Sequence, residues 1–340
     1  MPPASEPITD SHPTDTCHMS SLDTALASAF PDATVTEVDE QTTRPGNRTA
    51  RVAFAERDPA YLKVQTDGAT RIRREIAATR HAAAHAGLRV PTVIGADARG
   101  EGAAPPYLAT EPLPGTLFNE PWTDDGDREA LLRRVGRAVG AVHEARFDAG
   151  GQITGWDGAH ATVDDTAWTE TLCAVVEERG TGWFCDRFAD LPGEVIETIR
   201  AVEPTLDGVT PRLVHADPSR INLHVEPLGL LDWERALVGD PAYGLVEAEF
   251  HHLDQPDVSD DERAALLEAL HSGYRDRRGE LPPTLERYGP LYRAIAHLLV
   301  PQAFDDWASD VDRPLDDLEA EVREEANRWL AAAREECGAS

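Results

Sequence analysis

Three polar side chains stand at short intervals in an otherwise apolar stretch of the chain, "LVHADPSRINLHVEPLGLLDWERALVGDP" (213–241). They are Asp217, Asn222 and Asp232. Burying acids among Leu, Val and Ile costs free energy unless a counter-charge accompanies them. A bound cation with a phosphate would supply that counter-charge, which makes this stretch the first candidate for chemistry.

The order and spacing of these residues suit phosphoryl transfer. That reaction needs cations on the phosphates and an acceptor held in line with the bond that breaks. An Asp that takes the hydroxyl proton, with an Asn and a second Asp that hold a metal, would meet those needs. The string H-A-D-P-S-R-I-N keeps the Asp-to-Asn offset of the kinase loop H-R-D-x-x-x-x-N. Singly, each residue is more often a turn or capping residue, so the prediction depends on all three in order.

Lys63 adds an independent indication. It is the only lysine among the 32 basic residues, and it lies inside a strand-like run, "AYLKVQ" (60–65). An ammonium on a flexible stem can reach phosphate oxygens. Glu75, in the helix predicted to follow, could hold that ammonium in place, although "RIRREI" is also consistent with a charged helix face. In a chain that uses Arg for its other cations, we expect Lys63 to have a function.

The charge balance excludes several kinds of partner. There are 62 acidic residues and a formal net charge of −30, spread along the whole chain. A nucleic-acid binder or a protein attracted to anionic lipid needs a basic surface, so neither is expected. A uniformly acidic, lysine-poor surface resembles that of proteins from salt-loving archaea, because concentrated salt screens the self-repulsion. The acidic surface would then reflect a solvent of high salt concentration, and it would not indicate the charge of the substrate.

Other features favour a cytoplasmic protein without a membrane span. The four cysteines lie far apart and show neither zinc nor disulfide spacing. No stretch approaches 18 apolar residues. Residues 1–19 are rich in Pro, Ser and acids, which predicts a disordered tail rather than a signal peptide. Met19 is an alternative start.

Residues 20–112 have the pattern of a small antiparallel-sheet lobe with one helix. A short helix at 20–30 precedes strand-like runs at 33–38, 50–55 and 60–65. Thr70 is a candidate N-cap for a helix over 70–87, on which Ile72 and Ile76 share a side. Two more strands are predicted at 91–97 and 105–115.

Residues 113–340 are predicted to form a larger, mainly helical lobe. Residues 128–147 carry apolar side chains at helical spacing. Similar patterns recur near 163–178, 193–203, 242–254, 260–276, 286–308 and 314–336. The candidate catalytic stretch lies between these helices as a strand, a loop and a strand. The fold class is therefore α+β, with two lobes.

The chain resembles the aminoglycoside phosphotransferase family, whose members are small-molecule kinases with a protein-kinase-like fold. The specific part of the resemblance is "LVHADPSRINLHV" followed by "GLLDWERALVGDPAYGL". The segments "YLKV", "REIAATR", "YLATEPLPG" and "VGRAVGAVHE" resemble other landmarks of that family in the same order. The chain departs from the family pattern at Ala216, where Gly is usual, and at Gly244, where Asp is common.

The resemblance implies a reaction and a set of roles. ATP or GTP would be the donor, Mg²⁺ the cofactor, and a small hydroxylated molecule the acceptor. Asp217 would be the catalytic base, and His215 would brace its loop. The remaining roles are metal ligands (Asn222 and Asp232), a phosphate contact with its partner (Lys63 and Glu75), a glycine-poor loop over the phosphates (Gly46 and Asn47) and a hinge against adenine (Thr110 and Glu111).

Two other classes of protein remain alternatives. A protein kinase would need an Ala-Pro-Glu segment and an activation loop, yet "WERALVGDPAYG" leads directly into a predicted helix. A nucleotide-binding module without catalysis is disfavoured because all the polar site residues are present. His81 and His85 have the spacing of a zinc pair, but the Glu of a zinc-protease motif is missing, so a solvated helix face is expected. His251 and His252 either line the acceptor site or end a helix.

Overall fold

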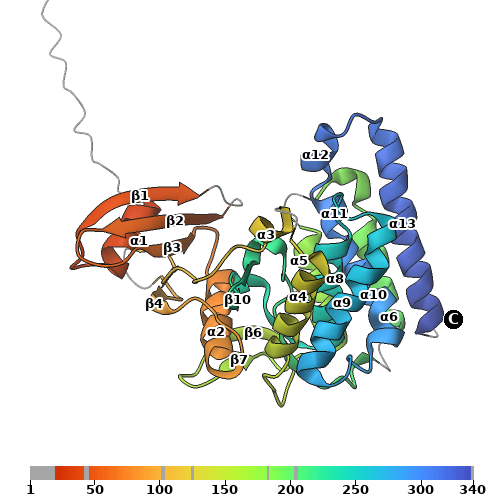
Figure 1. Cartoon of the computed structure of the whole chain (residues 1–340), viewed down its shortest axis with the longest axis horizontal. Coiled ribbons are helices and arrows are strands. Elements are labelled where there is room, and N and C mark those ends of the chain that lie inside the picture. Colours follow the sequence, from red (N-terminus) through yellow and green to blue (C-terminus); the bar gives the residue numbers. More distant parts are fainter. Residues whose placement is uncertain are drawn as a thin grey trace, which may run out of the picture.

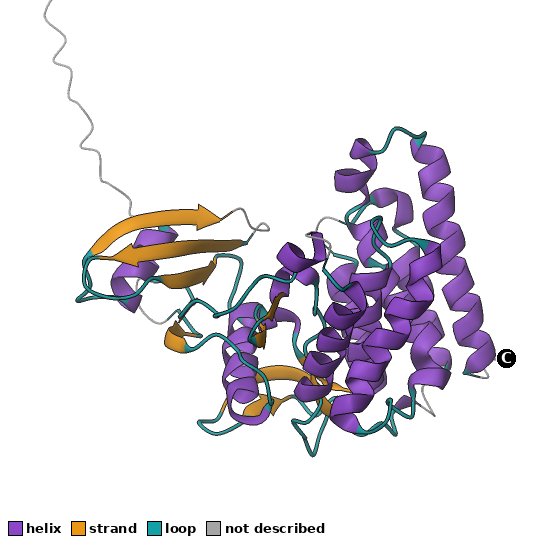
Figure 2. Cartoon of the chain, viewed as in Figure 1, coloured by secondary structure: helices purple, strands orange, loops and turns teal. Residues whose placement is uncertain are grey.

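The computed structural model describes residues 20–41, 46–100, 104–123, 126–181, 184–202 and 206–337. The predicted tail at 1–19 lies outside these ranges. Figure 1 shows a small group of strands at one end of the molecule and a larger body of helices at the other. Figure 2 shows a second, smaller group of strands within the helical body. The two-lobed α+β fold is thus confirmed.

The smaller lobe is a five-stranded antiparallel sheet in the order β1-β2-β3-β5-β4. Its strands are β1 (Val35–Gln41), β2 (Asn47–Phe54), β3 (Ala60–Gln65), β4 (Val93–Asp97) and β5 (Tyr107–Thr110). Helix α1 (Ser21–Ala29) adds Leu22 and Leu26 to the core on one face of the sheet. Because side chains alternate along a strand, Leu62 and Val64 enter that core and Lys63 faces the other way.

Helix α2 (Thr70–His85) joins the two lobes. Ile72 and Ile76 pack against Leu108 of β5, whereas Ala77, Ala78 and Ala82 belong to the core of the larger lobe. Burial of each Ile contributes about 1.5–3 kcal/mol. Two apolar faces on one helix therefore fix its position at the boundary between the lobes, and Glu75 lies there.

The larger lobe is built on helices, as predicted. They are α3 (Asn119–Thr123), α4 (Arg128–Val142), α5 (Trp168–Arg179), α6 (Leu191–Ala201), α8 (Pro241–Leu253), α9 (Asp260–Arg278), α10 (Leu285–His297), α11 (Leu299–Gln302), α12 (Phe304–Trp307) and α13 (Leu315–Glu336). α4 buries Leu131, Val135, Val139 and Val142 on one face. Short 3₁₀ turns occur at Asp186–Phe188 (η1), Arg220–Asn222 (η2), Trp233–Arg235 (η3) and Ala308–Asp310 (η4).

Two small sheets hold the candidate catalytic stretch. Strands β7 (Ala161–Val163), β6 (Gly151–Trp156), β11 (Leu237–Gly239) and β8 (Arg212–Val214) pair in that order. Strands β9 (Leu223–Val225) and β10 (Leu228–Leu230) form a hairpin. The sequence predicted strands on either side of the loop, but the β6–β7 pair was not predicted.

Several predicted boundaries were wrong. Thr70 does not cap α2, because Ala69 occupies the N-cap position and makes no side-chain cap. The helix expected at 163–178 begins only at Trp168, since β7 extends to Val163. The single helix expected at 286–308 is divided into α10, α11 and α12. Pro301 lies at this division and lacks the N–H that a continuous helix requires.

Candidate active site

The ammonium of Lys63 contacts three carboxylates. Its Nζ lies 2.8 Å from Glu75, 2.7 Å from Asp232 and 2.9 Å from Glu234. β3 supplies the lysine and α2 supplies Glu75, whereas Asp232 and Glu234 come from the segment after β10. The predicted Lys63–Glu75 pair is therefore present, and two further acids from the larger lobe complete the cluster.

This cluster carries more negative than positive charge. Burial alone would lower the pKa of Lys63, but the three carboxylates outweigh that effect and raise it well above its ordinary value. Burial, together with the charges of Asp232 and Glu234, raises the pKa of Glu75 to about 7 despite the ammonium beside it. One ammonium is too little counter-charge for three acids, so the site would be stabilised by an additional cation.

The loop predicted to be catalytic holds Asp217 among residues of the larger lobe. The Nδ1 of His215 accepts a hydrogen bond from the Asp217 N–H at 3.3 Å, and its Nε2 lies 3.0 Å from the Leu231 carbonyl. His215 thus braces the loop, as the resemblance implied. Ala216 has a φ of 59°, in the left-handed region, which costs a non-glycine residue about 1–2 kcal/mol. The Gly that is usual in the family would adopt this φ freely, so Ala216 keeps the loop conformation at a cost in free energy.

Asp217 is held ionised by its surroundings. Burial would raise its pKa, but His251, Arg235 and His215 outweigh this and lower the pKa below its ordinary value. His251 Nε2 lies 3.4 Å from one carboxylate oxygen, and Arg235 Nε lies 3.9 Å from the other. Because burial lowers the pKa of His251, Arg235 is the permanent positive charge beside this carboxylate.

The residues predicted to hold a metal are suited to a hard divalent cation. The side-chain amide of Asn222 donates to the Asp217 carbonyl at 3.1 Å, which leaves its amide oxygen as the remaining acceptor. The Leu231 N–H bonds the Asn222 carbonyl at 3.0 Å, so the residue before Asp232 lies against the Asn222 backbone. Ligand atoms of Glu75, Asp232 and Glu234 lie within 4.8 Å of one another. Mg²⁺ prefers such oxygen ligands, and its two charges match the surplus of acid.

The two segments predicted to contact the nucleotide lie in the smaller lobe. Asn47, at the start of β2, donates from its side chain to Glu234 at 2.9 Å. Gly46 has a φ of 85°, and residues 42–45 of the same loop lie outside the described ranges. Thr110 ends β5, and the Glu111 N–H donates to the Thr92 carbonyl at 2.9 Å. The Glu111 N–H is therefore already engaged within the smaller lobe.

A cavity of about 360 Å³ reaches Ala216, the residue before Asp217. Ala216, Glu234 and Arg235 form one side of it. The remaining lining residues come chiefly from α2 and α5, with single contributions from β6, β11, α8 and α11 and from two loops. They are Asp67, Arg71, Arg74, Gln152, Val175, Glu178, Arg179, Thr181, Leu237, Tyr243 and Gln302. The cavity therefore lies between the Lys63 cluster and the helical lobe.

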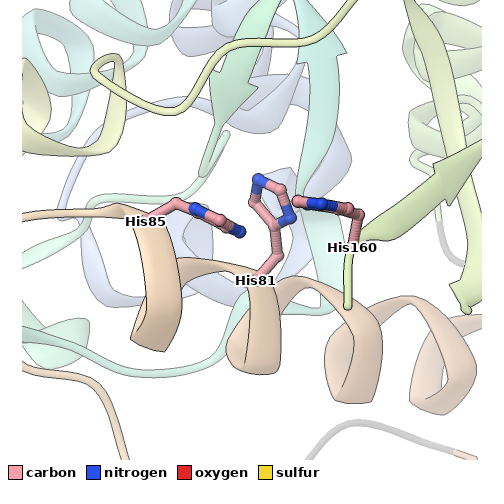
Figure 3. Close-up of side chains that lie close together, drawn as sticks. All are labelled: His81, His85 and His160. Carbon is pink, nitrogen blue, oxygen red and sulfur yellow. The ribbon is translucent and has the colours of Figure 1, made fainter. Parts of the chain in front are cut away.

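The expected solvated face on α2 is only partly present, since His85 is exposed but His81 is not. His81 is buried, and His160 from the β6–β7 turn joins His81 and His85 (Figure 3). The spacing suggests a metal, but the Ala161 N–H donates to His81 Nδ1 at 3.2 Å. A neutral His81 then carries its proton on Nε2 and has no free lone pair for an ion. We therefore treat this cluster as packing between α2 and the β6–β7 pair.

Three residues of the site were missed or left undecided from sequence. Glu234 and Arg235 follow Asp232 in "DWER", where the sequence pattern does not separate a surface charge from a site residue. His251 was left between two roles, and the structure places it beside Asp217. The signal that could have identified Glu234 and Arg235 is their position directly after a predicted ligand.

Comparison with known proteins identifies the family. Residues 42–282 match the Phosphotransferase enzyme family, which is well over half of the chain. The chain belongs to this family of phosphotransferases and has the kinase-like fold. No curated protein matches it.

Solved structures agree on the fold. A thermostable mutant of aminoglycoside phosphotransferase APH(4)-Ia, in a ternary complex with AMP-PNP and hygromycin B, has a TM-score of 0.61 at 19% identity. That match covers 92% of this chain and 99% of the other. A choline/ethanolamine kinase family protein from Mesorhizobium loti has a TM-score of 0.53 at 18% identity, with 88% and 92% covered. The GDP and kanamycin complex of an APH(2") enzyme has a TM-score of 0.55 at 16% identity, with 91% and 97% covered.

Among the helices of the described ranges, none is long and apolar enough to cross a membrane.

Proposed function

We propose that the protein transfers the γ-phosphoryl group of ATP or GTP to a hydroxyl of a small molecule, with Mg²⁺ as cofactor. The observation that carries the proposal is the cluster at Lys63. One ammonium, three carboxylates and the loop of Asp217 and Asn222 come together from both lobes. The likeness to proteins crystallised with AMP-PNP and GDP supports a nucleotide donor.

Asp217 would act as the base. Its carboxylate is ionised, and its neighbours Ala216 and Arg235 line the cavity from which an acceptor hydroxyl would donate a hydrogen bond to it. The acceptor oxygen forms a bond to the γ-phosphorus as the bond to the β–γ bridging oxygen breaks. The hydroxyl proton passes to Asp217, and the nucleoside diphosphate leaves with the electron pair. General-base assistance of this kind is worth about 10²–10⁴-fold.

The other site residues would bind and orient the donor. Mg²⁺, when bound, neutralises phosphate charge. Asn222 and Asp232 would hold it. Lys63, fixed by Glu75, would contact the phosphates, and the carbonyl of Glu111, the residue after β5, would accept from the adenine amino group. We keep Thr110, Gly46 and Asn47 in the proposed nucleotide site.

A small acceptor is favoured over a protein substrate. α8 begins at Pro241, nine positions after Asp232, and β11 occupies part of that interval. There is no room for an activation loop in this segment. We also propose that the acidic surface is an adaptation to concentrated salt and that the protein acts in the cytoplasm, without nucleic-acid or membrane partners.

The experiment is a transfer assay with γ-labelled ATP and GTP over a panel of hydroxylated metabolites, alongside thermal-shift measurements with each Mg²⁺–nucleotide. Nucleotide binding should raise the melting temperature of both the wild type and Asp217→Asn. Transfer should fall by about 10²-fold or more in Asp217→Asn only. Stabilisation by neither nucleotide, or unchanged transfer in the variant, would contradict the proposal.

A further inference from the structure

The cavity lined by Ala216 and Arg235 has an unusual charge for this chain. Although the net charge is −30, four arginines line the cavity against three carboxylates. The arginines are Arg71, Arg74, Arg179 and Arg235. Apolar surface from Val175 and Leu237 completes a space large enough for a small ligand.

The lining carboxylates already have cationic partners. Asp67 pairs with Arg71 at 2.7 Å, and Glu178 lies 3.3 Å from Arg74. Glu234 belongs to the Lys63 cluster. Asp67 and Glu178 are therefore paired before a ligand enters, whereas the surplus of acid at Glu234 belongs to the proposed metal site.

Two of the arginines keep unused donors. Within the described residues, the guanidinium of Arg235 makes no hydrogen bond, and its nearest acid is Asp217 at 3.9 Å. Its side chain is 16% exposed, and none of its nitrogens is fully buried, so these donors are open to a ligand. Arg74 is buried, and its Nε also lacks a partner. Buried donors without acceptors are costly, which points to an acceptor supplied by a ligand.

We propose that the phosphoryl acceptor is a hydroxylated small molecule that carries an anionic group, a carboxylate or a phosphate, bound by Arg235 and Arg74. This rests on the proposed function. Guanidinium groups match the planar or tetrahedral oxygens of such anions with paired hydrogen bonds. Because Arg235 adjoins Asp217, an anion on Arg235 also brings a hydroxyl of the same molecule close to the base. The ion pair between the ligand's anionic group and Arg235 therefore orients the ligand.

The proposed acceptor differs from the compounds bound in similar proteins of known structure. One was crystallised with hygromycin B and another with kanamycin. An anionic acceptor would separate this chain from those proteins while the fold and the phosphoryl transfer stay the same. The difference would lie in the cavity lining rather than in the catalytic loop.

A matched series of sugars tests the proposal. Gluconate and glucose 6-phosphate are the anionic members, glucose is neutral and glucosamine is cationic. Transfer from the better of ATP and GTP is measured as kcat/KM, and binding is measured by thermal shift in the presence of AMP-PNP and Mg²⁺. We expect an anionic member to be favoured about ten- to a hundredfold over glucose. Comparing gluconate with glucose 6-phosphate distinguishes a carboxylate from a phosphate site.

Variants assign the effect to the arginines. Arg235→Gln and Arg74→Gln should remove most of the preference for the anionic sugar, and Arg235→Lys should restore part of it. Arg48→Gln, a half-buried change in β2 outside the cavity, should leave the preference intact. Thermal stabilisation by Mg²⁺–nucleotide alone shows that each variant is folded and that the proposed function still holds.

Equal or better use of glucose or glucosamine, or no response to either anionic sugar, would overturn the proposal. In that case transfer to the neutral or cationic sugar would leave the phosphotransferase function standing. If the wild type did not bind a nucleotide, the proposed function itself would be contradicted.

Discussion

The ammonium of Lys63 lies 2.7 Å from a carboxylate oxygen of Asp232, although 169 positions separate the two residues in the chain. One belongs to the sheet of the smaller lobe and the other to the segment after β10 in the larger lobe. This ion pair, with Glu75 and Glu234, connects the lobes across the proposed nucleotide site. A metal ion that binds Asp232 must therefore compete with the ammonium for this carboxylate.

Removing that ammonium should destabilise the protein in a way that Mg²⁺ partly reverses. Lys63→Met leaves three carboxylates close together without a counter-charge, which we expect to cost about 3–5 kcal/mol of the free energy of unfolding. Millimolar Mg²⁺ should stabilise the variant more than the wild type, because the ion no longer competes with Nζ. Urea unfolding with and without Mg²⁺ measures both effects.

Arg48→Met is the matched control for this change. Arg48 pairs with Glu40 in the same sheet, but both side chains are substantially exposed. The loss should be below about 1 kcal/mol and independent of Mg²⁺. Equal losses in the two variants would show that the Lys63 cluster is an ordinary surface pair.

The crossing of α4 and α9 should not tolerate a side chain at its glycines. A Cβ at Gly273 would lie 1.9 Å from the Arg133 carbonyl, and one at Gly136 would lie 2.0 Å from the Leu270 carbonyl. Gly273→Ala would have to push two helix backbones apart, at about 1–3 kcal/mol or more. Gly289→Ala in α10 meets only a side-chain atom at 3.9 Å and should gain about 0.5–1 kcal/mol. If both variants were stabilised, the close crossing would be refuted.

Buried histidines should make the protein less stable in mild acid. His143 is buried, and burial, with Arg278 and Arg212 nearby, lowers its pKa to about 3. Between pH 6.5 and 3 the unfolded chain binds this proton and the folded protein does not. The free energy of unfolding therefore falls as the pH falls, by up to ~1.4 kcal/mol per pH unit for this group.

His143→Gln isolates that contribution, because it removes one titrating group. From pH 6 to 5 the variant's free energy of unfolding should depend on pH less steeply. The difference in slope should correspond to about one fewer proton taken up on unfolding. Urea titrations at fixed high salt measure the two slopes. An identical slope in both proteins would mean that His143 titrates in the folded state as it does in the unfolded chain.

The acidic composition leads to a prediction about salt. With a net charge of −30, self-repulsion opposes folding, and salt screens it. Raising KCl from 0.2 to 2 M should increase the melting temperature by ~5–10 °C, which corresponds to a few kcal/mol. A melting temperature that stayed constant or fell would argue against adaptation to concentrated salt.

Much of this arrangement could be predicted from sequence, for identifiable reasons. The spacing of Asp217, Asn222 and Asp232 is local, and the rarity of lysine singled out Lys63. The role of Arg235 could not be predicted, because it depends on which charged residues in distant elements already have partners. The strand β6 was missed because "GQITGW" lacks a clear alternation of apolar residues. His81 was misplaced because its burial depends on the β6–β7 pair.

The hinge could also be predicted only in part from the sequence. The stretch "ATEPL" was predicted to face the adenine edge with its backbone. Which backbone N–H and C=O groups of this stretch are free for a ligand depends on the irregular pairing of β4 with β5. Next to that pairing, the Glu111 N–H donates to the Thr92 carbonyl. Such a bond between segments that lie apart in the chain leaves no pattern in a single sequence.

Anomalous diffraction from crystals grown with Mn²⁺ and AMP-PNP tests the central claim most directly. A metal peak bonded to the Asp232 carboxylate and the Asn222 amide oxygen is expected, with Lys63 moved onto the phosphates and the γ-phosphoryl group facing Asp217. A metal and nucleotide bound elsewhere, with Lys63 still held by Asp232, would contradict it.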